Sequence, residues 1–112
     1  AIYDASDRRI KENIIEISDA LTMVNSLKPR RFNRKNVDAS KYKYGFIADE
    51  FIDVFPNSVA GEADGMEDVL DDEGNLTGTR IKPQSIATNN LFGVFAKAIQ
   101  ELSSKVEALE NA

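Results

Sequence analysis

A regular repeat of apolar side chains dominates the last part of the chain. Two sets of positions, each spaced seven residues apart, interleave there: Phe92, Ile99 and Val106, and Phe95, Leu102 and Leu109. This spacing matches the a and d positions of successive heptads and predicts a long helix over residues 84–110. Leu91 and Ala98 widen the apolar stripe toward the rest of the domain.

The apolar seam of this helix needs a partner, because a single helix cannot bury such a seam alone. The seam can pack across its own domain, but its regularity up to the C-terminus favours self-association. Branched residues at a with leucine at d are typical of two strands, whereas layers of phenylalanine favour a wider core. The pattern predicts an oligomer and leaves its stoichiometry open.

Shorter elements are predicted upstream of this helix. A short helix is expected over residues 20–26, started by a cap at Ser18-Asp19. Pro29 disfavours helical backbone at the preceding residue and marks its end. Residues 30–34 then have the composition of a short strand.

Residues 42–56 hold the densest apolar cluster of the chain. Aromatic and branched side chains over residues 42–48 predict a strand. Asp49 is placed to cap a short helix that ends at Pro56. We expect the core of the monomer here, formed by Tyr44, Phe46, Ile47, Phe51, Val54 and Phe55.

A β-hairpin is predicted where residues 66–70 and 76–81 flank the turn sequence Asp71-Asp72-Glu73-Gly74-Asn75. The turn lacks the ligand alternation and the distal glutamate of a calcium loop, so no metal site is expected there. The elements together predict an α+β fold, in which short strands and short helices form a small globular part before the long C-terminal helix. The 112 residues suffice for one domain.

The composition excludes several kinds of chemistry. The chain has no cysteine and no histidine, which removes disulfides, thiolate catalysis, common zinc sites and histidine-based triads. Acid–base chemistry must therefore use Lys, Asp, Glu or Tyr, and no cofactor is expected. No apolar run approaches the roughly 18 residues of a membrane span, so no membrane partner is expected.

The net charge of −5 is unevenly distributed. Residues 28–43 hold seven basic side chains and one acidic one, whereas residues 49–73 hold ten acidic side chains and no basic one. Such blocks can attract each other within the domain or between subunits, or they can be solvated faces of two loops. The basic block is a weak signal for nucleic acid, and the acidic block would repel phosphate.

A candidate for chemistry lies near the N-terminus, where Ser6 and Lys11 are five residues apart. A serine hydroxyl becomes nucleophilic when a base takes its proton, and a desolvated lysine amine can be that base. The spacing alone suits an exposed Ser-Asp turn or a helix cap equally well. Five residues is too far for contact along an extended strand, so the chain must turn here or the lysine must act on a neighbouring subunit.

Four segments of the chain, in order, carry a resemblance to a known family: Ser6-Asp7-Arg8-Arg9-Ile10-Lys11, Leu27-Lys28-Pro29-Arg30-Arg31-Phe32, Tyr44-Gly45-Phe46-Ile47-Ala48-Asp49-Glu50-Phe51 with Val54-Phe55-Pro56, and Ala98-Ile99-Gln100-Glu101-Leu102. They resemble the C-terminal intramolecular chaperone domain of phage tail fibres and tailspikes, the endosialidase-type chaperone or peptidase S74. Asp49 stands where the family usually has Gln. The resemblance covers Ser6 to about Leu109.

The resemblance implies a homotrimer that aligns three chains while an upstream intertwined β-structure folds, and that then cuts itself off. It makes Ser6 the expected nucleophile and Lys11 its expected base, in an autoproteolytic serine peptidase that acts once, within a chain or between subunits. Residues 1–5 would be the end of the upstream stem and residues 6–112 the chaperone domain, with Phe92, Phe95, Ile99, Leu102, Val106 and Leu109 at the trimer interface. Its expected location is the host cytoplasm during phage assembly.

The resemblance places the cut next to Ser6 and favours the Ser6–Asp7 bond. Attack by the Ser6 hydroxyl on its own carbonyl closes a strained four-membered ring, whereas attack on the Ala5 carbonyl has the geometry of an N–O shift. Both routes stay open. Other hypotheses are a trimeric cap without catalysis, a nucleic-acid-binding module using residues 28–43, and a related domain in a membrane-anchored transcription factor.

Overall fold

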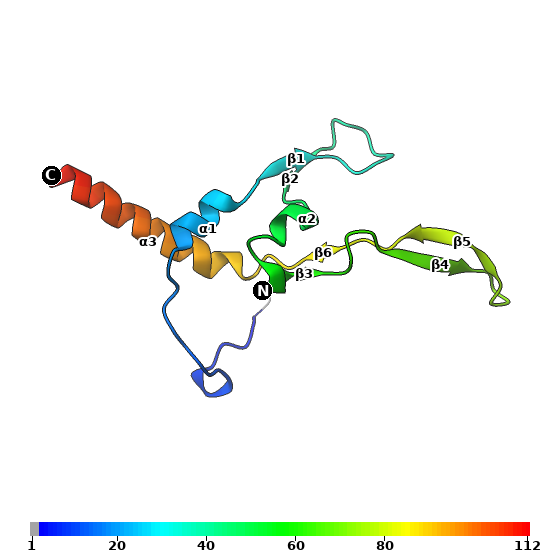
Figure 1. The fold of residues 1–112 in the computed structure, drawn as a ribbon, viewed down its shortest axis with the longest axis horizontal. Helices are drawn as coiled ribbons and strands as arrows, with labels where there is room; N and C mark the ends of the chain where they lie inside the picture. Colours follow the sequence, from blue (N-terminus) through cyan, green and yellow to red (C-terminus); the bar gives the residue numbers. More distant parts are fainter. Residues whose placement is uncertain (1–2) are drawn as a thin grey trace.

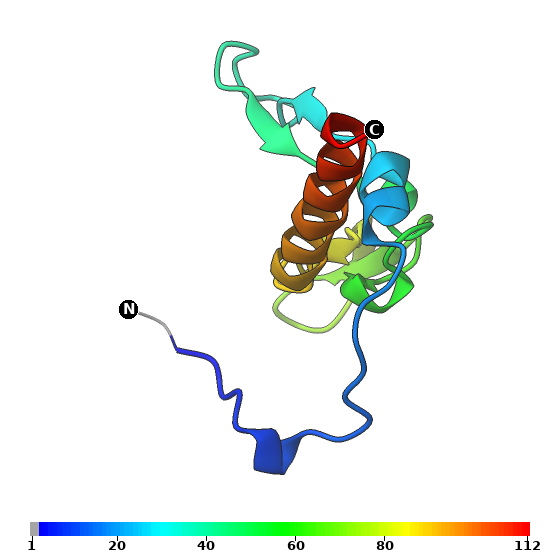
Figure 2. The same cartoon turned by 90° about the vertical axis from the view of Figure 1, so that its left-hand side faces the viewer.

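A computed structural model describes residues 3–112 of the chain. Ala1 and Ile2, which belong to the predicted upstream segment 1–5, lie outside the described residues. Residues 3–7 have no regular secondary structure, and a 3₁₀ turn η1 follows at Arg8–Ile10. This N-terminal segment loops away from the folded part and returns to it at the first α-helix (Figures 1 and 2).

Helix α1 spans Ala20–Ser26, as predicted, and ends before Pro29. The predicted cap is wrong. Asp19 has left-handed backbone, with φ 57° and ψ 29°, and its side chain makes no capping hydrogen bond. Glu101 of helix α3 takes this role instead, because its Oε1 accepts a hydrogen bond of 2.9 Å from the Leu21 N–H.

Strands β1 (Arg30–Phe32) and β2 (Lys43–Gly45) form an antiparallel pair in which Arg31 lies opposite Tyr44. Both are shorter than the predicted strands 30–34 and 42–48. The second strand ends early because Ile47 already precedes the first turn of helix α2, Ala48–Phe51. Asp49 is therefore inside that turn and is not its cap, although its charge still suits the positive end of the helix.

The segment after α2 contains two short elements that the sequence pattern did not indicate: the 3₁₀ turn η2 (Pro56–Ser58) and strand β3 (Val59–Ala60). Strand β3 pairs antiparallel with β6 (Ser85–Ile86). Between them, β4 (Met66–Leu70) and β5 (Leu76–Ile81) form the predicted hairpin, which projects from the folded part (Figure 1). Gly74, with φ +83°, provides the left-handed position of its turn.

Helix α3 spans Leu91–Glu110. It begins seven residues later than predicted because the Ser85–Ile86 strand occupies part of the expected helical segment. Ser58 joins the two regions: its backbone oxygen accepts from Ala87 N–H at 2.8 Å, and its buried hydroxyl accepts from the Asn90 amide at 2.6 Å. The early part of α3 is thereby fixed to η2.

The core is small and lies where α1 and α2 meet the first half of α3. Its buried apolar side chains are Ala20, Phe51, Phe55, Leu91, Val94 and Ala98, with Phe46 and Val54 partly buried beside them. Two predicted core residues are not in it, because Tyr44 is 76% exposed and Ile47 is 38% exposed. Tyr44 lies within strand β2 and Ile47 follows it by two residues, and both side chains remain exposed.

The observed fold is α+β, with short strands and helices and a long C-terminal helix, as predicted. Its shape is extended, with principal dimensions of 70 × 42 × 29 Å. None of the helices in residues 3–112 combines the length and apolar composition that crossing a membrane requires.

Candidate functional site: a serine and a lysine joined by a short turn

The turn η1 is built by Asp7 and Arg9. Asp7 has extended backbone, and its Oδ1 accepts a hydrogen bond of 2.8 Å from Arg9 N–H, which caps the turn. The Arg9 guanidinium folds back onto the same carboxylate, with Nε 3.0 Å from Oδ1 and a terminal nitrogen 2.8 Å from Oδ2. The two residues therefore hold the chain in a tight bend by local contacts alone.

The bend brings Ser6 and Lys11 together. Backbone hydrogen bonds of 3.1 Å run from Ile10 N–H to Asp7 O and from Lys11 N–H to Arg8 O. As a result, Lys11 Nζ donates a hydrogen bond of 2.7 Å to Ser6 Oγ. Of the two sequence alternatives, a turn within the chain or a lysine from a neighbour, this single chain contains the first.

The charged side chains of the turn have two different roles. Hydrogen bonds from Arg9 hold the pKa of Asp7 below its usual value, and the Asp7 carboxylate in turn raises the pKa of Arg9. Near neutral pH these two side chains form a carboxylate–guanidinium pair that neither gives nor takes a proton. Lys11, in contrast, contacts the hydroxyl of Ser6.

The contact has the geometry that proton transfer requires, since 2.7 Å is within reach of a general base. A neutral amine at this distance could accept the hydroxyl proton and leave an alkoxide beside the Ala5–Ser6 and Ser6–Asp7 bonds. Both side chains are exposed, as is every residue from Tyr3 to Asp19. Within the described chain, no other element covers the turn or excludes water from it.

The six residues predicted at a trimer interface lie along one face of α3, and all of them are exposed. Phe92 and Leu109 are each 77% exposed, while the neighbouring face, with Leu91, Val94 and Ala98, is buried on the domain. Between the two faces, Leu21 and Val24 of α1 and Phe95 of α3 help to line an apolar groove of about 230 Å³. The seam is thus not used up by packing within the chain, and its role in assembly stays a prediction.

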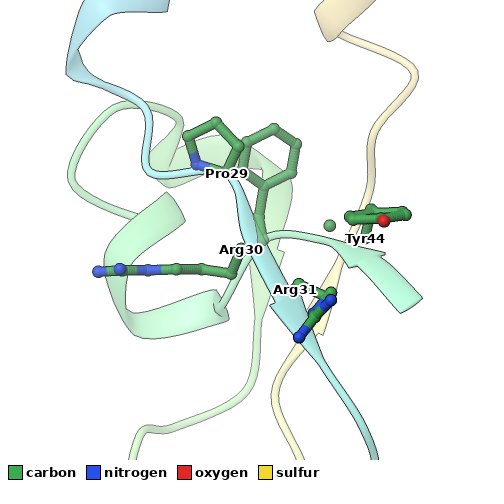
Figure 3. A pocket seen from close by; sticks show the side chains of 6 residues that line it. Pro29, Arg30, Arg31 and Tyr44 are labelled. Carbon is green, nitrogen blue, oxygen red and sulfur yellow. The ribbon is translucent and has the colours of Figure 1, made fainter. Parts of the chain in front are cut away.

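A second surface was missed by the sequence analysis, which assigned Tyr44 to the core. Pro29, Arg30, Arg31, Tyr44, Gly45 and Phe46 line an open groove beside the β1–β2 pair (Figure 3). Arg30 points toward α2, where it pairs with Glu50, and Tyr44 points to the opposite side. An aromatic residue on a strand predicts a buried side chain. The exposure of Tyr44 became apparent only from the structure.

A family model and a solved structure are similar to this chain. Residues 6–60 match the sequence model of peptidase S74, described as chaperone of endosialidase. A solved structure described as "Crystal structure of a novel intramolecular chaperon" has the same fold, with a TM-score of 0.58 and 23% sequence identity. The similarity covers 89% of this chain and 99% of that one.

No curated protein matches the chain. The family match begins at Ser6 and includes Lys11, the turn, and the β1–β2 and α2 segments. Over residues 6–60, just under half of its length, the chain matches the peptidase S74 family, the chaperone of endosialidase, and the fold of most of the chain is that of the solved intramolecular chaperon.

Proposed function

We propose that this domain is the C-terminal intramolecular chaperone of a phage tail fibre or tailspike, active as a homotrimer in the host cytoplasm, and that it releases itself by autoproteolysis next to Ser6. The observation that carries the catalytic part is the 2.7 Å contact between Lys11 Nζ and Ser6 Oγ. The exposed heptad seam of α3 supports the trimer, because apolar side chains in this pattern are typical of coiled coils.

The proposed chaperone action follows from the cost of pairing chains. An intertwined β-structure has high contact order, so its strands must find each other before they gain stabilising contacts. A trimeric domain at one end holds three upstream stems together and raises their effective concentration. Removing the domain afterwards leaves the stems without the element that aligned them, so an unfolded stem would refold slowly.

The proposed cleavage begins when neutral Lys11 takes the Ser6 hydroxyl proton and the oxygen attacks a neighbouring carbonyl carbon. The lysine then returns the proton to the leaving amide nitrogen as the C–N bond breaks. Attack on Ala5 gives an ester on Ser6 and a free Ser6 amine, and water hydrolyses the ester. Attack on the Ser6 carbonyl gives a four-membered lactone and a free Asp7 amine. The new N-terminus, Ser6 or Asp7, distinguishes the routes.

A longer chain that carries its natural stem tests the proposal. We expect wild type to cut itself after assembly, and Ser6→Ala and Lys11→Ala to assemble as trimers without cutting. Ser18→Ala and Lys28→Ala are matched controls that should cut normally. The rate should increase with pH, because the amine must lose its proton before it can act as a base. Cutting at the same bond by Lys11→Ala would remove the lysine from the mechanism.

Mixing the two inactive chains before folding tests whether the pair works between subunits. Restored cutting in mixed trimers would mean that the lysine of one chain serves the serine of another. The intrachain contact predicts no restoration.

A trimeric cap without catalysis is the second candidate, favoured by the exposure of both Ser6 and Lys11. Stem-bearing trimers that stay uncut at every pH would support it.

A further inference from the structure

The β1–β2 pair and its connecting loop form an arm, here called the basic arm (residues 29–46), that extends from the folded part (Figure 1). Six basic residues and one acidic residue lie in it. Its groove, about 480 Å³, is bordered by Arg31 and the exposed Tyr44. Arg31 stacks on the Tyr42 ring at 4.4 Å, and the Tyr42 and Tyr44 rings meet edge to face at 5.6 Å. The arm therefore offers an aromatic groove surrounded by positive charge.

The β4–β5 hairpin, here called the acidic hairpin (residues 66–81), has the opposite character. The cross-strand pairs Met66–Ile81 and Leu70–Leu76 lie on one face, and all four side chains are more than half exposed. Asp68 lies between these pairs on the same face. The other face carries an ion pair of 2.7 Å between Arg80 and Glu67. Asp71, Asp72 and Glu73 add negative charge at the tip.

The two surfaces do not meet within one chain. The basic arm and the acidic hairpin project toward the same end of the molecule, but they stay apart in both views (Figures 1 and 2). Arg30 is engaged with Glu50 of α2 at 2.6 Å, and Arg80 with Glu67 inside the hairpin. Among the ion pairs and hydrogen bonds of residues 3–112, none joins the arm to the hairpin. Each surface is therefore open to a second molecule.

We propose that the acidic hairpin of one copy docks on the basic arm of the next copy around the assembly. This inference rests on the proposed trimer. In a cyclic assembly the contact is heterologous, so one patch of each subunit meets a different patch of its neighbour. Two unlike and complementary patches on one chain fit that geometry. A two-fold dimer could pair the same two patches reciprocally, so the ring of three comes from the proposed trimer and not from the patches.

The chemistry of the two patches matches in both its apolar and its charged parts. Leu70 and Leu76 would cover the groove beside Tyr44, removing exposed apolar surface from both subunits. The carboxylates of Asp68, Asp72 and Glu73 would face lysines at the rim of the arm. Such charge pairs select the correct neighbour and orient it during assembly.

Charge reversal tests the electrostatic part. The variant D68K/D72K/E73K spares Asp71, which holds the turn, and K35E/K41E/K43E reverses the arm. Each should raise the dissociation constant of the trimer by about tenfold at low salt and much less at high salt. A control that adds positive charge on the outer face of α3, Q100K/S104K, should change neither the constant nor its salt dependence.

Mixing the two reversed chains distinguishes contacts between subunits from effects inside one chain. In a mixed trimer two of the three hairpin–arm contacts pair opposite charges and one still pairs like charges, so association should recover in part. Recovery only when both reversals are in the same chain would contradict docking between copies.

Disulfide trapping tests the placement directly, because the chain has no cysteine of its own. The variant Y44C/L70C should form covalently closed trimers on oxidation, and each single variant should not. In the control Y44C/R80C, one cysteine is on the opposite face of the hairpin, and it should cross-link poorly. A trimeric wild type that gives no Y44C/L70C cross-link and no response to charge reversal would overturn the docking and leave the trimer intact. A monomeric wild type would instead contradict the proposed function itself.

Discussion

At the scale of single residues, the pairing of Ser6 with Lys11 depends on a side chain between them. The five-residue spacing indicated the two reactive groups but not the bend that joins them. The bend exists because Asp7 accepts from Arg9 N–H and pairs with the Arg9 guanidinium. An aspartate that caps a turn can be recognised in a sequence. The distance of 2.7 Å between the Lys11 amine and the Ser6 hydroxyl cannot.

We therefore predict that Asp7 acts on cleavage through positioning. In the stem-bearing chain, Asp7→Ala should slow self-cleavage because the capping bonds that hold the turn are lost. Asp7→Asn should retain much of the rate, since the amide oxygen can still accept from Arg9 N–H. The measurement is the appearance of the cut fragment over time, with Arg8→Ala as the control. Equal rates for Asp7→Ala and wild type would show that the turn forms without its cap.

Asp71 gives a prediction on pH at the same scale. Its Oδ1 accepts from Asn75 N–H at 2.8 Å and from Glu73 N–H at 2.9 Å. The backbone hydrogen bond from Asn75 is the main cause that holds the pKa of Asp71 below 3.8. Because the pKa of Asp71 is lower in the folded turn than in the unfolded chain, its charge stabilises the turn at any pH above the unfolded-state pKa. This stabilisation disappears as the pH falls through the lower, folded-state pKa.

The amide NMR signals of Glu73 and Asn75 should thus shift together when the pH falls below about 4. In Asp71→Asn the two signals should show no such titration, because the amide keeps the acceptor and cannot be protonated in this range. A turn that keeps its amide shifts unchanged down to pH 2 in wild type would contradict this role for Asp71.

At the scale of elements, the sequence analysis predicted most helices and strands but misplaced their ends. The 66–70 and 76–81 strands and helix 20–26 agree with the structure, because their turn residues and Pro29 are local signals. The start of α3 and the caps of α1 and α2 do not agree. The short β3–β6 pairing and the Glu101–Leu21 bond join residues far apart in sequence, which local patterns do not contain.

Glu101 should therefore contribute to stability as a cap supplied by another helix. We expect Glu101→Ala to lower the free energy of unfolding by about 1 kcal/mol, the usual cost of losing a capping acceptor. Glu101→Gln should lose less, because its amide oxygen can still accept from Leu21 N–H. Urea unfolding at a fixed protein concentration measures both, with the exposed Glu107→Ala as control. If Glu101→Ala and Glu107→Ala have the same free energy of unfolding, the hydrogen bond between Glu101 and Leu21 makes no net contribution to stability.

At the scale of the whole molecule, the single chain is far from compact. Its radius of gyration is 19.9 Å, whereas about 13 Å is typical of a compact domain of this length. The charge blocks were visible in the sequence, but the projection of the basic arm and of the acidic hairpin, which holds only part of the acidic block, was not. Local patterns do not indicate which parts of a chain leave the core, so the open surfaces emerged only from the fold.

The seam of α3 carries the prediction on assembly. Changing Ile99 and Leu102 together to Asp should convert trimers into monomers or aggregates, because two buried charges in each chain would oppose association. The matched control Q100D/S104D places the same charges on the outer face and should remain trimeric. Light scattering at micromolar concentration gives the mass directly. A wild-type domain that is monomeric there would contradict the trimer.

The exposed stretch from Tyr3 to Asp19 has a practical consequence. Among residues 3–112 the first buried one is Ala20, well beyond the candidate cut, so severing the chain near Ser6 removes no core contact that the described residues make. The timing of release and the stability of the domain can then change independently, since substitutions in one region leave the other intact. The domain could serve as a removable assembly tag, with the recognition sequence of an unrelated protease replacing residues 3–16 and the experimenter choosing when three aligned chains are set free.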